Sequence, residues 1–216
     1  MGNYSNGLKI KRFKAREYFS NCFCVINNAN RRALLIDPGD RVVKNLVRFM
    51  KWNRLTLDYV ILTHEHFDHI AGVNPLRKKY EFKIIATVEA SACFQDPRKN
   101  LSLFYYMDGI GIECPAADIT IDGLKSPFIW NEHKIEFIKT PGHSLGSMCV
   151  SIGDLLFSGD TIIPGVKTIT KLPGSSKETV YRSLKTIYSR FGDETIVFPG
   201  HGDPLRLCFT PIEEHI

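Results

Sequence analysis

The stretch Thr63-His64-Glu65-His66-Phe67-Asp68-His69 is the part of this sequence that decides its fold. It follows Asp58-Tyr59-Val60-Ile61-Leu62, an apolar run typical of a buried strand. The pattern H-x-H-x-D-H places four potential metal ligands within six positions. Side chains alternate along an extended segment, so His64 and His66 can face one ion, while Asp68 and His69, beyond the turn, can face a second. A solvated loop would also accommodate these residues, so the pattern alone leaves two interpretations.

Three further candidates each follow a predicted strand. His143 comes after a Pro-Gly pair at the end of the predicted strand 135–139, and His201 comes after a second Pro-Gly pair beyond the last one, 195–198. Asp160 ends another apolar run, 155–158. Strand-to-loop exits are where α/β proteins assemble active sites from separate elements. We therefore predict a site for two metal ions with the ligands His64, His66, Asp68, His69, His143, Asp160 and His201.

Periodicity predicts one α/β domain that spans residues 1–216. Strands are expected at 8–13, 22–26, 33–36, 57–62, 82–86, 135–139, 148–152, 155–158 and 195–198. Helices are expected at 41–52, 88–94, 100–106 and from a capping box at Ser175 and Glu178 to Phe191. Strands dominate both halves with helices between them, which suggests two mixed sheets with helices on their outer faces, a four-layer αββα sandwich.

Composition excludes several classes of protein. Charges interrupt every stretch of twenty residues, so we expect no membrane span. The N-terminal segment 1–16 is polar and basic, which argues against a secretory signal, and the six cysteines show no C-x-x-C spacing. Free thiols in a reducing compartment, and hence a cytoplasmic location, are expected. The oligomeric state is left open.

The net charge of +5 is partly local, because five basic residues lie between Lys9 and Arg16. They alternate with Leu8, Ile10 and Phe13 as on the solvated face of a strand, which is not a nucleic-acid signature. An acidic partner is the alternative interpretation. The two histidines outside the candidate site, His133 and His215, are expected at the surface.

The five motif segments from His64 to His201, in this order, resemble the metallo-β-lactamase superfamily, and specifically its glyoxalase II-like branch. The Asp37-Pro38-Gly39 turn after a short N-terminal meander is similar as well. The resemblance implies that His64, His66 and His143 hold one metal, that Asp68, His69 and His201 hold the second, and that Asp160 bridges them. Zinc β-lactamases usually carry Cys at the position of Asp160, which argues against antibiotic hydrolysis.

The implied chemistry is hydrolysis of an acyl thioester by a hydroxide that bridges two Zn²⁺ ions, with Asp68 as the catalytic group that orients it and accepts its proton. A thiolate leaves with little protonation, which suits a site without an obvious general acid. Thr63 and Ser144, next to ligands, are expected to bond those ligands or to cap helices. Iron or manganese would also suit these ligands. The alternatives are a mononuclear iron persulfide dioxygenase, another hydrolase of this fold (lactonase, phosphodiesterase or β-lactamase), or a metal-free binding module.

The substrate is harder to predict. Glutathione-dependent glyoxalase II enzymes carry a C-terminal helical domain that binds the glutathione tail, and we expect none here because fifteen residues follow His201. The segment 167–175 occupies the place of a loop of the bacterial relatives, with Lys171 in place of an Asp. Similar short hydrolases accompany polyketide synthases. We therefore expect a small-molecule or carrier-protein-bound thioester, with Lys167 and Lys171 as candidate substrate-binding residues.

Overall fold

The strands form two mixed sheets, as predicted. The computed structural model describes residues 2–4, 7–39, 42–107, 109–122 and 127–216. Within them, the first sheet has the order β1 (Gly2–Asn3), β2 (Leu8–Lys14), β3 (Asn21–Asn27), β4 (Arg32–Ile36), β5 (Thr56–Ile61), β6 (Lys83–Thr87) and β7 (Ile119–Ile121). Neighbours from β1 to β4 are antiparallel, and those from β4 to β7 are parallel.

The second sheet has the order β13 (Leu205–Arg206), β12 (Ile196–Pro199), β11 (Leu155–Gly159), β10 (Met148–Ile152), β9 (His133–Lys139) and β8 (Phe128–Trp130). β11 and β12 are parallel, and the other neighbours are antiparallel. Every residue of β10 and β11 is buried. This burial fits the nearly continuous apolar sequence of strands that are covered on both faces.

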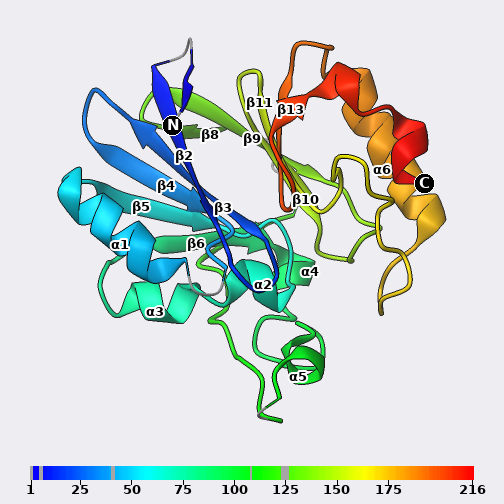
Figure 1. Ribbon diagram of the computed structural model, residues 1–216, viewed down its shortest axis with the longest axis horizontal. Coiled ribbons are helices and arrows are strands. Elements are labelled where there is room, and N and C mark those ends of the chain that lie inside the picture. The colour runs from blue at the N-terminus through cyan, green and yellow to red at the C-terminus, as the bar shows by residue number, and fades with distance from the viewer. Residues whose placement is uncertain (1, 5–6, 40–41, 108, 123–126) are drawn as a thin grey trace.

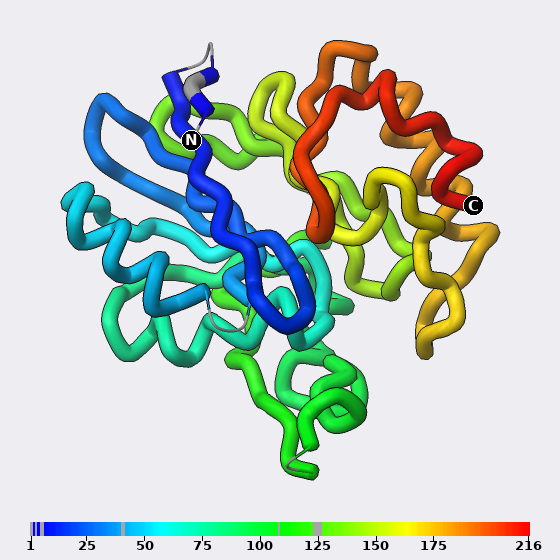
Figure 2. Tube along the Cα trace, in the orientation of Figure 1, coloured from blue at the N-terminus to red at the C-terminus, as the bar shows by residue number. Residues whose placement is uncertain are grey.

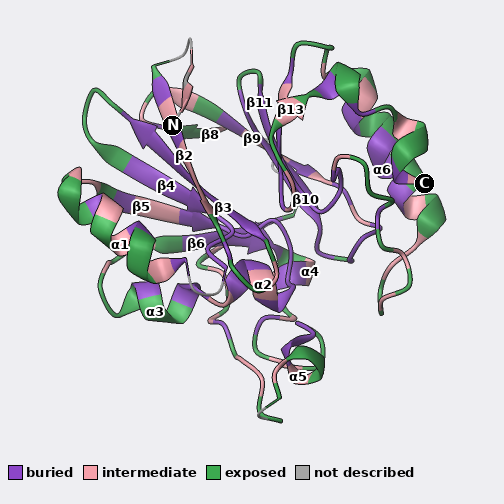
Figure 3. Ribbon diagram, in the orientation of Figure 1, coloured by how far each residue is buried: buried purple, intermediate pink, exposed green. Residues whose placement is uncertain are grey.

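Three apolar clusters separate four layers. Leu46 of α1 (Val43–Trp52) and Leu76 of α3 (Val73–Arg77) pack against the outer face of the first sheet. Phe23 and Phe157 belong to the cluster between the sheets. Leu184 of α6 (Lys177–Arg190) packs against the outer face of the second sheet. Figures 1 and 3 show these helices on the two outer sides, with buried strands between them, so the αββα prediction is confirmed.

The remaining short helices lie near the strand ends: α2 (Phe67–Ile70), α4 (Val88–Ser91), α5 (Ser102–Tyr105) and the 3₁₀ turns η1 (Leu207–Phe209) and η2 (Ile212–His215). α5 projects from the body of the molecule in Figure 1. Among the described residues, no helix is long and apolar enough to cross a membrane. All six cysteines are free thiols.

Several local predictions need correction. The N-cap of α6 is Ser176, whose Oγ accepts a hydrogen bond from Thr179 N at 3.3 Å. The predicted capping residue, Ser175, instead donates to the carbonyl oxygen of His143 at 2.8 Å. The helices expected at 88–94 and 100–106 are shorter, and the predicted start of the first helix at Arg41 lies outside the described residues.

The expectation of a surface position was wrong for His215, which is 1% exposed. Its Nε2 lies 2.6 Å from Thr210 Oγ1, and its Nδ1 lies 3.4 Å from the carbonyl oxygen of Val166. Both ring nitrogens therefore have partners inside the protein, which is what makes burial of an imidazole affordable. Its place near the end of the sequence gave no sign of these contacts.

Candidate metal centre

The H-x-H-x-D-H run begins at the carboxyl end of β5 and ends inside α2. His66 is the N-cap of α2 and has extended backbone (φ −64°, ψ 140°). Asp68 and His69 lie within the helical turn that follows. This change from extended to helical backbone sends the side chains of the run in two directions, so one short segment supplies ligands to two neighbouring clusters.

Asp37, at the end of the parallel neighbour β4, holds this run in place. Its buried carboxylate accepts hydrogen bonds from Thr63 N at 2.8 Å and Thr63 Oγ1 at 2.7 Å, and it lies 3.0 Å from His69 Nδ1. Because both oxygens are engaged in this way, Asp37 orients the ligands. From the sequence, Asp37 is expected only in a turn. Its position at the end of the strand beside β5 was the signal that could have identified this role.

The first cluster consists of His64, His66 and His143, whose donor atoms all lie within 4.8 Å of one another. His143 Nε2 is 3.0 Å from His66 Nδ1, and all three side chains are buried. His64 Nδ1 lies 3.0 Å from Thr63 Oγ1, which leaves Nε2 as its available donor. His143 comes from the loop between β9 and β10, so the cluster joins the two sheets.

The second cluster consists of Asp68, His69 and His201, whose donor atoms also lie within 4.8 Å of one another. Asp68 Oδ2 is 3.3 Å from His201 Nε2 and 3.5 Å from His69 Nε2. His201 follows β12, and an isolated bridge pairs it with Ser20 at the start of β3. Figure 2 shows the orange turn after β12 beside the blue N-terminal hairpin.

Asp160 lies between the two clusters. Its Oδ2 is 3.5 Å from His143 Nε2 in the first cluster and 3.5 Å from His201 Nε2 in the second. Its Oδ1 is 3.5 Å from His69 Nε2. A single carboxylate therefore reaches both groups of donors, as a bridging ligand must. All seven predicted residues come together in this centre.

Glycine at position 200 makes this close approach possible. A Cβ at Gly200 would lie 2.2 Å from Asp160 Oδ1 and 2.8 Å from His69 Cε1. Any larger residue would displace the carboxylate that lies between the clusters. The Pro-Gly pair before His201, noted in the sequence, thus has a steric reason here.

The donor atoms fit metal ions better than they fit each other. Among the described residues, His64 Nε2, His69 Nε2 and Asp160 Oδ1 are buried polar side-chain atoms of the centre without a hydrogen-bond partner. Buried polar groups without partners are costly, and native proteins contain few of them. Imidazole and carboxylate donors at this density suit zinc, iron or manganese. The residues present therefore fit the two-ion centre predicted from the sequence.

Burial and neighbouring charges shift the pKa values of the histidines in the centre in opposite directions. Burial, helped by the neighbouring imidazoles, lowers the pKa of His64 well below its usual value and that of His66 to about 3. Burial alone would also lower the pKa of His69, but Asp68, Asp160 and Asp37 raise it to about 10. The first cluster thus presents neutral imidazoles, the form that binds metals, while the second is rich in negative charge.

A second layer of hydrogen bonds supports the first cluster. Ser144 Oγ donates to Glu65 Oε2 at 2.8 Å, and Ser144 Oγ and Ser147 Oγ lie 2.9 Å apart. Burial raises the pKa of Glu65 above its usual value. Ser144 bonds Glu65 rather than a ligand, whereas Thr63 bonds His64 directly, so of these two predicted supporting residues only Thr63 touches the ligand set.

A cavity of about 180 Å³ opens onto the centre. Its lining consists of Tyr18, His66, Phe67, Asp68, Leu101, Tyr105, His143, Asp160, Ile169, Leu172 and His201. Lys167 and Lys171, the candidate substrate-binding residues, do not line it. They line a neighbouring cavity of about 310 Å³ together with Lys177, and Ile169 borders both spaces.

Comparison with known families agrees with the fold. A family model described as the metallo-beta-lactamase superfamily matches residues 15–201. The chain belongs to the metallo-β-lactamase superfamily. The match extends from the turn after β2 to His201, so it contains all seven residues of the centre.

Relatives and solved structures of this superfamily match most of the chain. The probable metallo-hydrolase YqgX of Bacillus subtilis (strain 168) is 30% identical over 197 residues, with 90% of each chain covered. The probable polyketide biosynthesis zinc-dependent hydrolase PksB of the same organism is 27% identical, with 83% of this chain and 72% of PksB covered. The BLEG-1 B3 metallo-β-lactamase has a TM-score of 0.84 at 25% identity, with 95% of each chain covered. The di-iron-bound form of TTHA1623 has a TM-score of 0.75 at 25% identity, with 92% and 96% covered.

Proposed function

We propose that this metallo-β-lactamase superfamily member is a dinuclear metal-dependent hydrolase that cleaves acyl thioesters. The observation that carries the proposal is the position of Asp160, which lies 3.5 Å from both His143 Nε2 and His201 Nε2. Isolated three-residue groups could each hold one ion. A carboxylate shared between two such groups supports a paired centre, the arrangement used for hydrolysis by two-metal enzymes.

In this proposal His64, His66 and His143 hold one ion, Asp68, His69 and His201 hold the other, and Asp160 is shared. When bound, two divalent ions supply a nucleophilic oxygen at neutral pH and neutralise negative charge on an acyl oxygen. Zinc is the proposed metal, supported by the name of the relative PksB, while TTHA1623 shows that a similar fold at 25% identity accommodates iron.

Asp68 is the proposed proton acceptor. Burial alone would raise its pKa, but His69 and the hydrogen bond from His201 hold the pKa of this carboxyl well below its usual value. The side chain is therefore ionised at neutral pH. Its carboxylate lines the cavity beside His69 and His201, where it can orient an attacking water and accept its proton.

The surroundings of the centre favour a leaving group that needs no protonation. Apart from the proposed ligands, the titratable side chains that line the described cavity are Tyr18 and Tyr105. A thiolate leaves without a strong general acid, whereas an alkoxide or amide does not. This difference supports a thioester over an ester or amide.

The second part of the proposal is that the thiol of the substrate carries a negatively charged group. Lys167, Lys171 and Lys177 line the cavity beyond Ile169, next to the catalytic space. They would attract a phosphopantetheine group or the acidic carrier protein that bears it. The assignment of PksB to polyketide biosynthesis, where acyl groups travel on carriers, adds support from a relative.

Metal analysis combined with a substrate panel tests the proposal. Protein purified without added metal should contain two zinc ions per chain. It should hydrolyse acyl-pantetheine thioesters faster than acyl-glutathione, a lactone, a phosphodiester or a chromogenic cephalosporin. One iron per chain with oxygen uptake on glutathione persulfide, or faster turnover of the cephalosporin, would overturn it.

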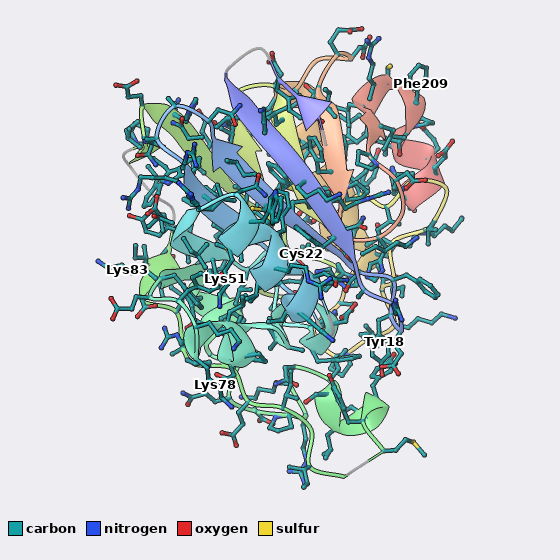
Figure 4. The ribbon with its side chains drawn as sticks, turned by 60° about the vertical axis from the view of Figure 1, so that its left-hand side comes forward. Tyr18, Cys22, Lys51, Lys78, Lys83 and Phe209 are labelled. Atoms are coloured by element: carbon teal, nitrogen blue, oxygen red, sulfur yellow. The ribbon has the colours of Figure 1, made fainter. Side chains whose placement is uncertain are left out.

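Charge reversal of the cavity lysines tests whether they bind a negatively charged group on the thiol. In the double variant Lys167→Glu/Lys171→Glu, kcat/KM for a carrier-protein thioester should fall at least about tenfold at low salt, mainly through KM. Turnover of a neutral N-acetylcysteamine thioester should stay unchanged. The matched control is Lys51→Glu/Lys78→Glu on the far side of the first sheet, which Figure 4 labels. An equal loss in both double variants would contradict a specific docking site.

A further inference from the structure

The cavity beside the metal centre has an apolar wall without a cation. The lining residues outside the proposed ligand set are Tyr18, Phe67, Leu101, Tyr105, Ile169 and Leu172. Among the residues that line the described cavity there is no lysine or arginine, and the carboxylates are the two proposed ligands Asp68 and Asp160. A carboxylate at the far end of an acyl group, away from the metal ions, would therefore find no positive side chain on this wall.

Three aromatic rings from three separate elements form the centre of this wall. Phe67 of α2 and Tyr105 of α5 are stacked with centroids 5.0 Å apart and an interplanar angle of 29°. Tyr18, from the hairpin between β2 and β3, lies edge-on to Phe67 at 4.7 Å and to Tyr105 at 6.1 Å. Figure 4 shows Tyr18 at the end of this hairpin, close to α5. Because Phe67 lies between His66 and Asp68 in the sequence, the aromatic wall is directly adjacent to the metal centre.

The segment that carries Tyr105 is tied down at its base. The Asn100 side chain donates to the carbonyl oxygens of Phe94 (3.1 Å) and Ile112 (2.8 Å). Its Oδ1 accepts from Ser102 N at 3.0 Å, and Ser102 Oγ accepts from Ile112 N at 2.8 Å. Both ends of the segment 101–112 are thereby joined, so the aromatic wall is held next to the centre before substrate arrives.

Apolar surface continues outward from the wall along the same segment. Phe104, Met107 and Ile110 are 68%, 103% and 75% exposed, and Tyr105 is 49% exposed. Large apolar side chains that gather at a site rather than lying singly mark binding surfaces. Here the exposed residues belong to the same segment as Tyr105, which lines the cavity.

We propose that the acyl group of the substrate is an uncharged hydrocarbon chain that lies on this aromatic wall and runs outward toward α5. This inference rests on the proposed thioester hydrolysis and names the substrate class of the same site. The carbonyl carbon lies at the metal centre, the first methylenes fill the cavity of about 180 Å³ on Phe67 and Tyr105, and longer chains continue over Phe104 and Met107. The thiol leaves toward Ile169 on the other side of the cavity.

A chain-length series on one thiol tests this assignment. With N-acetylcysteamine thioesters from acetyl to octanoyl, kcat/KM should rise about two- to fourfold per methylene, in line with apolar burial. Succinyl thioester, with its terminal carboxylate, should be hydrolysed more slowly than butanoyl thioester. Rates that are equal from acetyl to octanoyl, or highest for succinyl, would overturn the proposal.

Variants locate the effect. Tyr105→Ala should lower kcat/KM for octanoyl thioester about tenfold and change that for acetyl thioester less than twofold. The matched control is Phe209→Ala, an aromatic residue that is 69% exposed in η1, which should change neither rate. An equal loss for both substrates in Tyr105→Ala would mean that the ring supports the fold of the site and does not select the acyl chain.

Binding separates this inference from the proposed function. Ketone analogues, in which a methylene replaces the thioester sulfur, cannot be hydrolysed at that bond, and their Kd values can be measured by calorimetry on the metal-loaded protein. Affinity that rises with chain length in the wild type and not in Tyr105→Ala supports the wall even if no thioester is turned over. Affinity independent of chain length refutes the wall even if thioesters are cleaved.

Discussion

Two charged clusters lie toward opposite ends of β5, and their buried polar atoms differ in whether they have hydrogen-bond partners. At the amino end, the Asp58 side chain is 5% exposed and accepts hydrogen bonds from Arg32 Nε (2.8 Å) and Trp130 Nε1 (2.7 Å). At the carboxyl end, His64 Nε2 and Asp160 Oδ1 have no hydrogen-bond partner among the described residues. Both clusters connect the two sheets, because Trp130 belongs to β8 and Asp160 directly follows β11.

The difference separates a structural cluster from a binding centre. A polar group that is buried with its partners stabilises the fold, whereas one that is buried without them costs free energy and persists because a ligand satisfies it. Charge and burial alone would not distinguish the two ends of the strand. The unpaired atoms do, and the predictions below test this distinction.

The largest expected effect is on activity, from loss of the shared carboxylate. Asp160→Ala should reduce metal content below two ions per chain and lower kcat/KM for a thioester by more than about 100-fold, because Lewis-acid stabilisation amounts to several kcal/mol. Metal analysis of the same preparation that is used for kinetics links the two losses. A circular dichroism spectrum like that of the wild type would show that the variant is folded and that both losses arise at the centre.

His69→Ala provides an independent check of the second cluster. It should reproduce the joint loss of metal and activity, since His69 Nε2 faces both Asp68 and Asp160. Wild-type turnover by either variant with only one ion bound would show that the second ion is not needed.

A smaller loss is expected from Asp37, which orients ligands without belonging to them. Asp37→Asn should weaken metal affinity or lower activity by about 10- to 100-fold, the usual effect of removing a partner of a ligating histidine. The asparagine amide cannot accept from both Thr63 and His69 as the carboxylate does. Excess zinc should restore much of the activity of Asp37→Asn, and failure of this rescue would place Asp37 among the groups that act in the reaction.

Asp160 and Asp37 show what could and could not be predicted from the sequence. The seven candidate ligands could be selected from the sequence because their motifs are local: histidines and aspartates follow strands. The role of Asp37 was not predicted, because recognising it requires knowing that β4 lies parallel to β5, a tertiary contact between residues 26 positions apart. The αββα layers could be predicted from alternating strand and helix periodicity, since burial of one face of each element is encoded in that period.

The errors have the same physical origin. Choosing Ser176 over Ser175 as N-cap depends on the bond from Ser175 to the carbonyl oxygen of His143, 32 residues away. The burial of His215 depends on Thr210 and on the distant Val166. The aromatic wall combines Tyr18, Phe67 and Tyr105, which no sequence period connects. Features that need long-range contacts were missed, and features set by local patterns were found.

Substitution in the Asp58 cluster should lower stability and leave activity unchanged, the converse of the result expected for Asp160→Ala. Asp58→Ala should lower the free energy of unfolding by about 2 kcal/mol, because Trp130 Nε1 loses its acceptor while the half-exposed Arg32 remains solvated. Urea denaturation measures this change. Below the unfolding transition, kcat/KM and metal content should match the wild type.

The control for Asp58→Ala is Arg182→Gln, which removes an exposed ion pair with Glu178 on α6 and should leave the unfolding transition unchanged. A loss of activity in folded Asp58→Ala would contradict the division of labour between the two ends of β5.

The smallest expected effect concerns His215. Like Asp58, this buried side chain has hydrogen-bond partners inside the protein, whereas His64 Nε2 has none. Burial lowers its pKa below 6.5 in the folded protein. The unfolded state therefore binds the proton more readily, and the stability that His215 contributes is complete above pH 6.5 and is lost as the pH falls below that value. The difference in unfolding free energy between wild type and His215→Gln should thus narrow from pH 7.5 to pH 5.5. The titrations of the other histidines cancel in this difference. A difference in unfolding free energy that stays constant or widens toward acid would show that His215 binds a proton in the folded protein as readily as in the unfolded one. Hydrogen bonding inside the protein would then no longer distinguish His215 from the histidines of the metal centre.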